Sequence, residues 1–266
     1  MPAYRARALV LKKTKLGETD TIVTALAADG RQVRAVAKGA RGPRSRLGGR
    51  LEPYTVTDLL LHTGRSLDVV SEAETVRSNE AVCAELDRSV AASAVCDTLE
   101  KLTADADEQP VLFELGAATL DAIGEARSDA LPALVAAFLV KAMSMTGLRP
   151  SLALCARCAC EEADGLAFSP AAGGALCAEC GPIEPRTLEM SCEARDTLEA
   201  LLRARMWDVE GLGIDPDVQR DVLRLMRAFA HEHVHGRLRA LEVVWGMYAD
   251  GTWPGPAEEA APHIDP

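Results

Sequence analysis

Four cysteines with paired spacing are the residues best suited to chemistry in this sequence. Cys155 and Cys158 form one Cys-x-x-Cys pair, Cys177 and Cys180 form a second, and eighteen residues separate the two pairs. Each pair can supply two thiolates to one side of a tetrahedron, with the intervening segment folded as a small loop or hairpin. The spacing therefore predicts one Zn²⁺ per chain, held by four thiolates. Because four thiolates fill the tetrahedral coordination sphere, we expect the ion to be structural and not catalytic.

The other four cysteines do not share this spacing. Cys160 follows Cys158 by two residues and competes as an alternative ligand, although the paired four fit the tetrahedral pattern better. Cys83, Cys96 and Cys192 lie in helical patterns or at the start of one, and we expect them to be packing residues, because a free thiol behaves as a small apolar group. Clustering at metal-ligand spacing in a chain of 266 residues favours reduced thiols over disulfides.

The first fifty residues are basic, although the chain as a whole is acidic. Residues 1–50 contain twelve Lys and Arg against three acidic side chains, a net charge of +9, whereas the whole chain carries −11 and the other residues therefore carry −20. A basic module on an acidic body gives a directional field that attracts a polyanion to one face, which indicates a nucleic acid partner. The predicted DNA-binding residues are Arg5, Arg7, Lys12, Lys13, Arg34, Lys38, Arg41, Arg44, Arg46 and Arg50.

Strand patterns fill the sequence up to about residue 77. Alternating apolar and polar residues, bounded by turn signals such as Asp29-Gly30, predict strands over residues 5–11, 21–27, 31–38, 54–62 and 66–70. Five short strands are the number of a small closed barrel such as the oligonucleotide/oligosaccharide-binding (OB) fold. The glycines and proline of residues 38–50 exclude regular structure there, and the five positive side chains of this basic loop can reach successive phosphates.

After residue 79 the apolar period changes from two to 3.6, which predicts helices. Residues 131–147 are apolar nearly all round and should form a central buried helix, while Ser191 and Asp215-Pro216 are suited to begin two later helices. The cysteine segment interrupts this helical region. We therefore expect an α+β multidomain protein, with an OB-fold domain at 1–78, a helical domain at 79–150 and 185–249, a zinc module at 151–184 and a disordered tail at 250–266.

Several short motifs occur in a fixed order over roughly residues 4–240. They are Gly17-Glu18-Thr19-Asp20, Ala37-Lys38-Gly39-Ala40-Arg41, Ser45-Arg46-Leu47-Gly48-Gly49, Leu51-Glu52-Pro53-Tyr54, Phe168-Ser169, Gly173-Gly174 and the two cysteine pairs. In this order and spacing the chain resembles the bacterial recombination mediator family RecO. The resemblance implies an OB domain, a helical domain and an inserted zinc module. It also implies a role in recombinational DNA repair, in which the protein binds single- and double-stranded DNA, anneals complementary strands and, with RecR, helps to load recombinase onto strands covered by single-strand-binding protein.

The aromatic content of the predicted barrel indicates how DNA would be bound. Only Tyr4 and Tyr54 are aromatic before residue 77, so the predicted barrel has few platforms on which bases can stack. We therefore expect phosphate contacts to dominate affinity, with little dependence on base sequence.

A second basic feature lies in the helical region. Arg220, Arg224 and Arg227 repeat at helical spacing opposite the apolar face, as a basic stripe that is a candidate contact for the acidic tail of single-strand-binding protein. Most such stripes are simply solvated.

Two other functional classes compete with this interpretation. His231-Glu232-His233-Val234-His235 satisfies the H-E-x-x-H pattern of zinc metallopeptidases, but no third ligand is identifiable, and Gly236 should place His235 in the last turn of its helix. A zinc-ribbon scaffold or transcription factor that binds only protein would not need a basic barrel. The sequence contains no G-x-x-x-x-G-K-[ST] phosphate-binding loop, and we expect a protein without enzymatic activity.

We expect a soluble protein of the cytoplasm, associated with the nucleoid and not with a membrane. The first residues do not form the apolar run of a signal peptide. The richest apolar stretch, residues 131–148, is interrupted by Pro132 and Lys141 and is short for a membrane span of about 20 residues.

Overall fold

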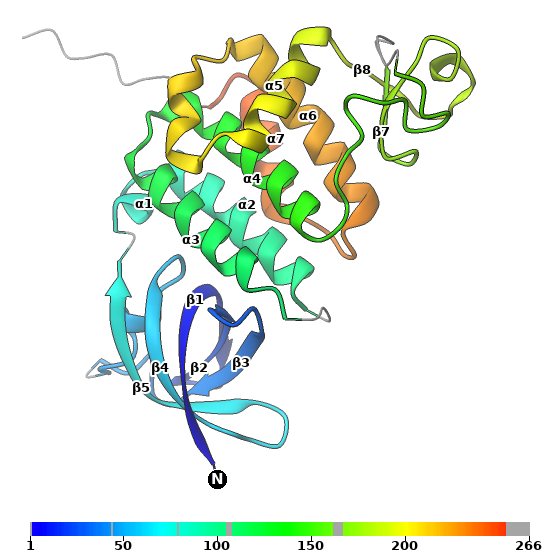
Figure 1. The fold of residues 1–266 in the computed structure, drawn as a ribbon. Coiled ribbons are helices and arrows are strands. Elements are labelled where there is room, and N and C mark those ends of the chain that lie inside the picture. Colours follow the sequence, from blue (N-terminus) through cyan, green and yellow to red (C-terminus); the bar gives the residue numbers. More distant parts are fainter. Residues whose placement is uncertain (1, 44, 79, 105–107, 162–166, 254–266) are drawn as a thin grey trace, which may run out of the picture.

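The computed structural model describes residues 2–43, 45–78, 80–104, 108–161 and 167–253. A strand-built domain forms one end of the molecule, a helical domain forms the other, and a small lobe containing the four paired cysteines projects from the side of the helices (Figure 1). The expected α+β architecture, with a five-stranded barrel followed by a helical region that carries the cysteine cluster, is confirmed.

Five strands close into a barrel in the order β1-β2-β3-β5-β4, which is the strand order of an OB fold. Strand β1 pairs with both β2 and β4, and the barrel is completed by a short parallel pairing of β3 with β5. The interior is filled mainly by alanine, valine and leucine, as the alternating pattern requires. The strands are β1 (Ala3–Leu16), β2 (Asp20–Ala27), β3 (Gln32–Ala37), β4 (Val56–His62) and β5 (Asp68–Arg77).

A bulge in β1 shapes the outer face of the barrel. The register against β2 shifts between Val10 and Lys12, so that Leu11 is an extra residue. As a result Leu11 and Lys12 are directed to the same outer side. Leu11 joins the core of the helical domain, and the Lys12 ammonium lies 3.2 Å from both carboxylate oxygens of Glu100.

Seven helices follow the barrel within the described residues. Helix α4 is the centre of the domain, because every residue from Leu131 to Met143 is buried. Residues 128–145 are the one described stretch that is long and apolar enough to cross a membrane, and 78% of it is buried inside the protein, as expected of a core helix. The helices are α1 (Glu80–Ala84), α2 (Leu86–Leu102), α3 (Pro110–Glu125), α4 (Leu131–Met145), α5 (Cys192–Arg203), α6 (Pro216–His233) and α7 (Arg239–Ala249).

The helix starts follow their capping residues. The Ser191 hydroxyl accepts a hydrogen bond from the Ala194 N–H at the start of α5, and the Asp215 carboxylate accepts one from the Asp217 N–H at the start of α6. Helix α6 ends at His233, two residues before the end expected from Gly236, because the backbone of Val234 is already extended.

The barrel and the helical domain share a packed junction. Leu9, Leu26 and Val56 on the barrel's outer face belong to the same apolar cluster as the helices. At Gly30, where φ is +92°, a Cβ atom would lie 2.1 Å from the backbone nitrogen of Gln109, so only glycine permits this approach.

The cysteine lobe is a three-stranded sheet in the order β7-β6-β8, formed by β6 (Ala167–Ser169), β7 (Gly174–Leu176) and β8 (Leu188–Glu189). Phe168 anchors the lobe to the helices: its ring is fully buried, 5.9 Å from the ring of Phe229 on α6.

The end of the chain differs in part from the expected tail at residues 250–266. Trp253 is buried, and its indole N–H donates to the Ser128 carbonyl at 2.8 Å, so this residue packs on the helical domain. Residues 254–266 lie outside the described part of the chain.

Candidate metal centre and nucleic-acid interface

The four paired cysteines meet at one point of the lobe. The sulfur atoms of Cys155, Cys158, Cys177 and Cys180 all lie within 4.8 Å of one another, and those of Cys158 and Cys177 are 3.8 Å apart. Two sulfurs that bind one Zn²⁺ tetrahedrally at about 2.3 Å are about 3.8 Å apart. The four side chains therefore fit a metal of this kind.

Local backbone geometry brings the two pairs together. The Ala156 N–H donates to the Ala175 carbonyl at 2.7 Å, which places the first pair beside the strand leading to the second. At Gly174 a Cβ atom would lie 2.1 Å from the Ser151 carbonyl oxygen, so this close approach requires glycine. Besides the cysteines, Leu176 is the one large apolar side chain buried in the lobe's own described cluster.

The surroundings of two sulfurs favour the thiolate form that a metal needs. Burial raises the pKa of the Cys155 thiol, but hydrogen bonds from the backbones of Cys158, Cys177 and Arg157 outweigh it and lower the pKa to about 6. A hydrogen bond from the backbone of Cys180 likewise lowers the pKa of Cys177. A bound cation would extend the same preference to all four thiols.

The four cysteines outside the two pairs differ in position and in burial. Cys160 does not belong to the group of mutually close sulfurs, and its hydrogen bond with Cys158 raises its pKa to about 12. Cys96 is buried, as expected of a packing residue, but Cys83 and Cys192 are exposed and that expectation was wrong for them. Both lie on outward faces of their helices, which apolar spacing alone did not reveal.

Four of the ten candidate DNA-binding cations have a carboxylate partner. Arg7 makes a two-pronged contact with Asp58, at 2.9 and 3.0 Å. The other pairs are Arg5 with Glu72 at 4.0 Å, Lys12 with Glu100 at 3.2 Å and Lys13 with Glu52 at 2.8 Å. The four carboxylates come from segments distant in sequence, so the net charge of residues 1–50 overstates the positive charge that this face presents.

Five other candidates form no ion pair with any described residue: Arg34, Lys38, Arg41, Arg46 and Arg50. All five are exposed. Arg44 lies outside the described residues. The basic loop of residues 38–50 lies next to the β1–β2 turn, because the Arg41 N–H donates to the Thr19 carbonyl at 2.9 Å and its guanidinium donates to the Gly17 carbonyl at 3.1 Å. The uncompensated cations thus extend from β3 over the basic loop to this turn.

Both barrel tyrosines are partly buried, and their hydroxyl groups are hydrogen-bonded. The Tyr4 hydroxyl donates to Asp68 at 2.5 Å, and burial together with this carboxylate raises the Tyr4 pKa to about 12. Tyr54 is directed at the helical domain, where its hydroxyl lies 2.8 Å from that of Ser93.

Each arginine of the basic stripe on α6 has a carboxylate partner. The pairs are Arg220 with Asp217 at 2.6 Å, Arg224 with Asp221 at 3.2 Å and Arg227 with Glu242 at 2.7 Å. Arg224 also donates to the Glu189 carbonyl of the lobe, at 2.6 Å. The stripe is therefore present, but its charge is largely balanced.

The histidines of the H-E-x-x-H pattern do not form a metal site. His231 lies 2.5 Å from Glu242, and His233 bonds the Pro170 carbonyl of the lobe at 2.9 Å. Because α6 ends at His233, His235 does not follow His231 on one helical face. Among the described residues, the cluster able to hold a metal is the cysteine cluster.

A closed barrel with the strand order of an OB fold, joined to a helical domain that carries a four-cysteine cluster able to hold a metal, defines the class of multidomain OB-fold proteins. Comparison with known proteins agrees. Residues 1–79 match the family model for the N-terminal domain of recombination protein O, and residues 83–242 match that for its C-terminal domain. The chain is also 32% identical over 249 residues to the DNA repair protein RecO of Bifidobacterium adolescentis, covering 92% of this chain and 100% of that protein. This chain belongs to the RecO family, whose role is in DNA repair and recombination and not in catalysis.

Proposed function

We propose that this protein is a mediator of homologous recombination that binds single- and double-stranded DNA through phosphate contacts of its barrel. In this role it anneals complementary strands and, with RecR, helps to load recombinase onto strands covered by single-strand-binding protein, in the RecF pathway. It would act in the cytoplasm at the nucleoid. The observation that carries the proposal is the group of exposed barrel cations without carboxylate partners among the described residues.

The two tyrosines support a mode of binding that is mainly electrostatic. With the Tyr4 hydroxyl bonded to Asp68 and Tyr54 facing the helices, the barrel offers little aromatic surface for stacked bases. Release of counterions from phosphates then provides most of the affinity, and such binding does not depend on base sequence. That property suits a protein that must act wherever DNA is damaged.

The metal centre supports the proposal indirectly. We propose that the metal is Zn²⁺ and that Cys155, Cys158, Cys177 and Cys180 bind it as thiolates. When bound, the ion supplies a structural cross-link and no open coordination position. The lobe that it holds together contacts α6, and this neighbourhood offers a surface for a protein partner.

The basic stripe is the proposed contact for the acidic tail of single-strand-binding protein. Because its three arginines are ion-paired, a tail carboxylate would have to exchange with Asp217, Asp221 or Glu242. Side chains of Arg224 and Arg227 are each 26% exposed, so both remain reachable. Unchanged tail-peptide affinity in Arg224→Glu would remove the stripe from the proposal.

Charge reversal at Arg46 tests DNA binding most directly. Arg46 is exposed and forms no ion pair with a described residue, so Arg46→Glu should leave the fold intact. Arg149, equally exposed and free of ion pairs with described residues, lies outside the barrel and gives a control with the same charge change. We expect Arg46→Glu to weaken oligonucleotide binding and to reduce the salt slope, d log K/d log [salt], by about 0.7 in magnitude, the value for one single-strand phosphate contact.

The measurements are fluorescence anisotropy over a range of salt concentrations and annealing of complementary strands coated with single-strand-binding protein. Binding that hardly changes between low and moderate salt, or equal slopes for Arg46→Glu and wild type, would contradict the proposal.

A further inference from the structure

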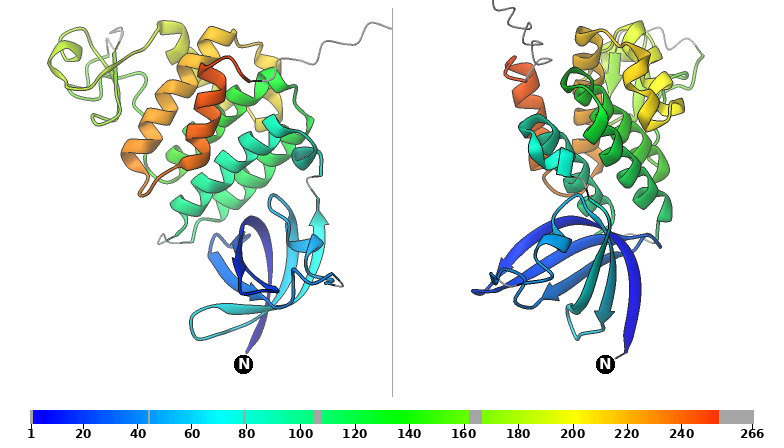
Figure 2. Two further views of the ribbon diagram at one scale, coloured as in Figure 1. Left: turned by 180° about the vertical axis from the view of Figure 1, so that it is seen from behind. Right: turned by 90° about the vertical axis from the view of Figure 1, so that its left-hand side faces the viewer.

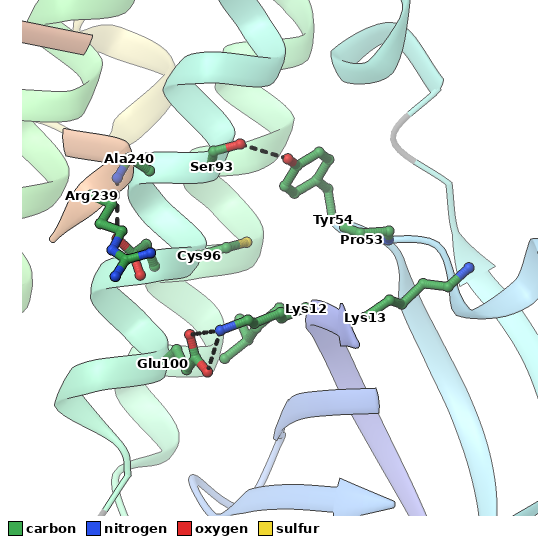
Figure 3. A pocket seen from close by; sticks show the side chains of 11 residues that line it. Lys12, Lys13, Pro53, Tyr54, Ser93, Cys96, Glu100, Arg239 and Ala240 are labelled. Atoms are coloured by element: carbon green, nitrogen blue, oxygen red, sulfur yellow. Dashed lines mark hydrogen bonds and ion pairs between the residues drawn. The ribbon is translucent and has the colours of Figure 1, made fainter. Parts of the chain in front are cut away.

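A polar cleft lies where the barrel meets the helices. It consists of two adjoining hollows of about 360 and 530 Å³, which share Lys12, Asp97 and Arg239 in their walls. Figure 3 shows the first hollow, with Lys12 and Tyr54 reaching from the barrel toward α2 and with Arg239 at the start of α7. The second hollow continues along α2 to Lys101 and to Arg237, in the segment between α6 and α7.

The second hollow is positive although the chain beyond residue 50 is acidic as a whole. Its walls carry four cations, Lys12, Lys101, Arg237 and Arg239, against the carboxylate of Asp97 and, from the adjoining hollow, that of Glu100. Three of the four cations, Lys101, Arg237 and Arg239, come from residues beyond 50, which carry a net −20, so such a group is unusual for this part of the chain.

Both carboxylates already have partners within the cleft. Asp97 accepts the backbone N–H of Ala240 at 3.2 Å, and Glu100 accepts two contacts from Lys12 at 3.2 Å and has Lys101 at 3.7 Å. Arg237 and Arg239 are exposed and form no ion pair with any residue in the described part of the chain. Two guanidinium groups are therefore available to an incoming anion.

The cleft and the proposed DNA-binding loop face the same side of the molecule. In the right-hand view of Figure 2 the far end of β1 extends to the side on which α2 and α7 lie. Lys12 in the cleft and Lys15 near the β1–β2 turn are three residues apart on β1, about 10 Å along the strand, and point to opposite faces of it. The turn contacts Arg41 of the basic loop, so the basic loop and the cleft lie at neighbouring points along β1.

We propose that this cleft is a second binding site for the phosphate backbone of DNA, contributed by the helical domain and continuous with the barrel surface. Lys101, Arg237 and Arg239 would contact phosphates of the strand after it leaves the barrel. The inference rests on the proposed function, because it extends the path of DNA held by the barrel. Guanidinium groups suit this task, since each presents several donors to phosphate oxygens.

The lysine content of the chain provides a direct test on the wild-type protein. The chain has six lysines: Lys12, Lys13, Lys15 and Lys38 in the barrel, Lys101 in the cleft, and Lys141 in the buried helix α4. Amine-reactive labelling followed by mass spectrometry therefore reports separately on the barrel through Lys38 and on the cleft through Lys101. Lys141, 9% exposed, serves as an internal reference.

We expect a 30-nucleotide single strand to reduce labelling of both Lys38 and Lys101 several-fold at low salt. Protection of Lys38 without protection of Lys101 would overturn the cleft inference and leave the proposed function standing. If DNA protected neither lysine, the result would count against both the cleft inference and the proposed function. Protection of Lys101 by an acidic peptide but not by DNA would assign the cleft to a protein partner and would also overturn the inference.

A pair of variants gives an independent measurement. Arg237→Gln/Arg239→Gln removes two positive charges from the cleft, and Arg149→Gln/Arg186→Gln removes two exposed charges elsewhere outside the barrel. If the cleft binds phosphates, the first variant should reduce the salt slope by about 1.4 in magnitude, for two contacts of about 0.7 each. Equal slopes for the two variants would refute a phosphate role for the cleft.

Discussion

Replacing Cys158 by serine separates the metal's contribution from packing. Cys158 is the one exposed member of the four-cysteine cluster, so Cys158→Ser removes a ligand without opening a cavity in a core. Cys192 is also exposed but lies outside the cluster, so Cys192→Ser is a matched control. We expect about one Zn²⁺ per chain in the wild type and in the control, and much less in Cys158→Ser.

The size of the effect follows from how little else holds the lobe together. Complete burial of one leucine side chain such as Leu176 contributes about 1.5–3 kcal/mol, whereas ordering the backbone costs about 1–2 kcal/mol per residue. A structural Zn²⁺ supplies about 10–16 kcal/mol in zinc-finger peptides. Without the metal the lobe should therefore open, while α4 and its neighbours remain folded through their own core.

Amide hydrogen exchange can detect this local opening. The Ser151 N–H bonds the Gly173 carbonyl at 2.9 Å, and the Gly181 N–H bonds the Cys177 carbonyl at 2.9 Å. Protection of these lobe amides should fall at least about 100-fold in Cys158→Ser, with no comparable change in α4. If a metal-free Cys158→Ser protein kept its lobe amides as protected as the wild type, the argument that the metal holds the lobe would be refuted.

Two further predictions concern the helical core. Phe168→Ala should lower the free energy of unfolding by about 3–5 kcal/mol, because the ring is fully buried against Phe229; denaturant titration checks this, and a loss below about 1 kcal/mol would contradict the packing. Lys141 donates to the Leu202 carbonyl at 2.8 Å, and burial lowers its pKa below 10.5. Because the pKa of Lys141 is lower in the folded state, this residue does not reduce the free energy of unfolding above pH 10.5, where the amine is neutral in both states. As the pH falls to the folded-state pKa, the buried amine must become charged, and the free energy of unfolding decreases. The stability of Lys141→Met relative to wild type should therefore be higher at pH 7 than at pH 10.5, as measured by denaturant unfolding at both pH values.

Local spacing allowed the sequence to predict the four-cysteine cluster. The two Cys-x-x-Cys turns and the short hairpin between them bring all four sulfurs together with few long-range requirements. The central helix α4 could also be predicted from the sequence, because a helix that is apolar on every side must be buried.

Long-range pairing explains what the sequence could not provide. Lys12 and Glu100 are 88 residues apart, so neither the neutralisation of this cation nor the cleft beside it follows from local pattern. Arg237 and Arg239 lie near each other in sequence, but their proximity to Lys12 depends on how the barrel packs on α2. The H-E-x-x-H pattern failed as a site for a related reason: two of its histidines bond to groups elsewhere in the fold, and the helix ends before the third.

The single extra residue in β1 sets what this strand presents to the helical domain. Paired residues of neighbouring strands share a face, so Val10 opposite Ala25 points into the barrel and Lys12 opposite Thr24 points outward. Deleting Leu11 would restore an unbroken ladder in which all the other residues of the strand keep their face, and only the apolar contact of Leu11 with the helical core would be lost. Related chains with a shorter first strand should therefore keep a closed barrel but attach it to their helices with less apolar contact.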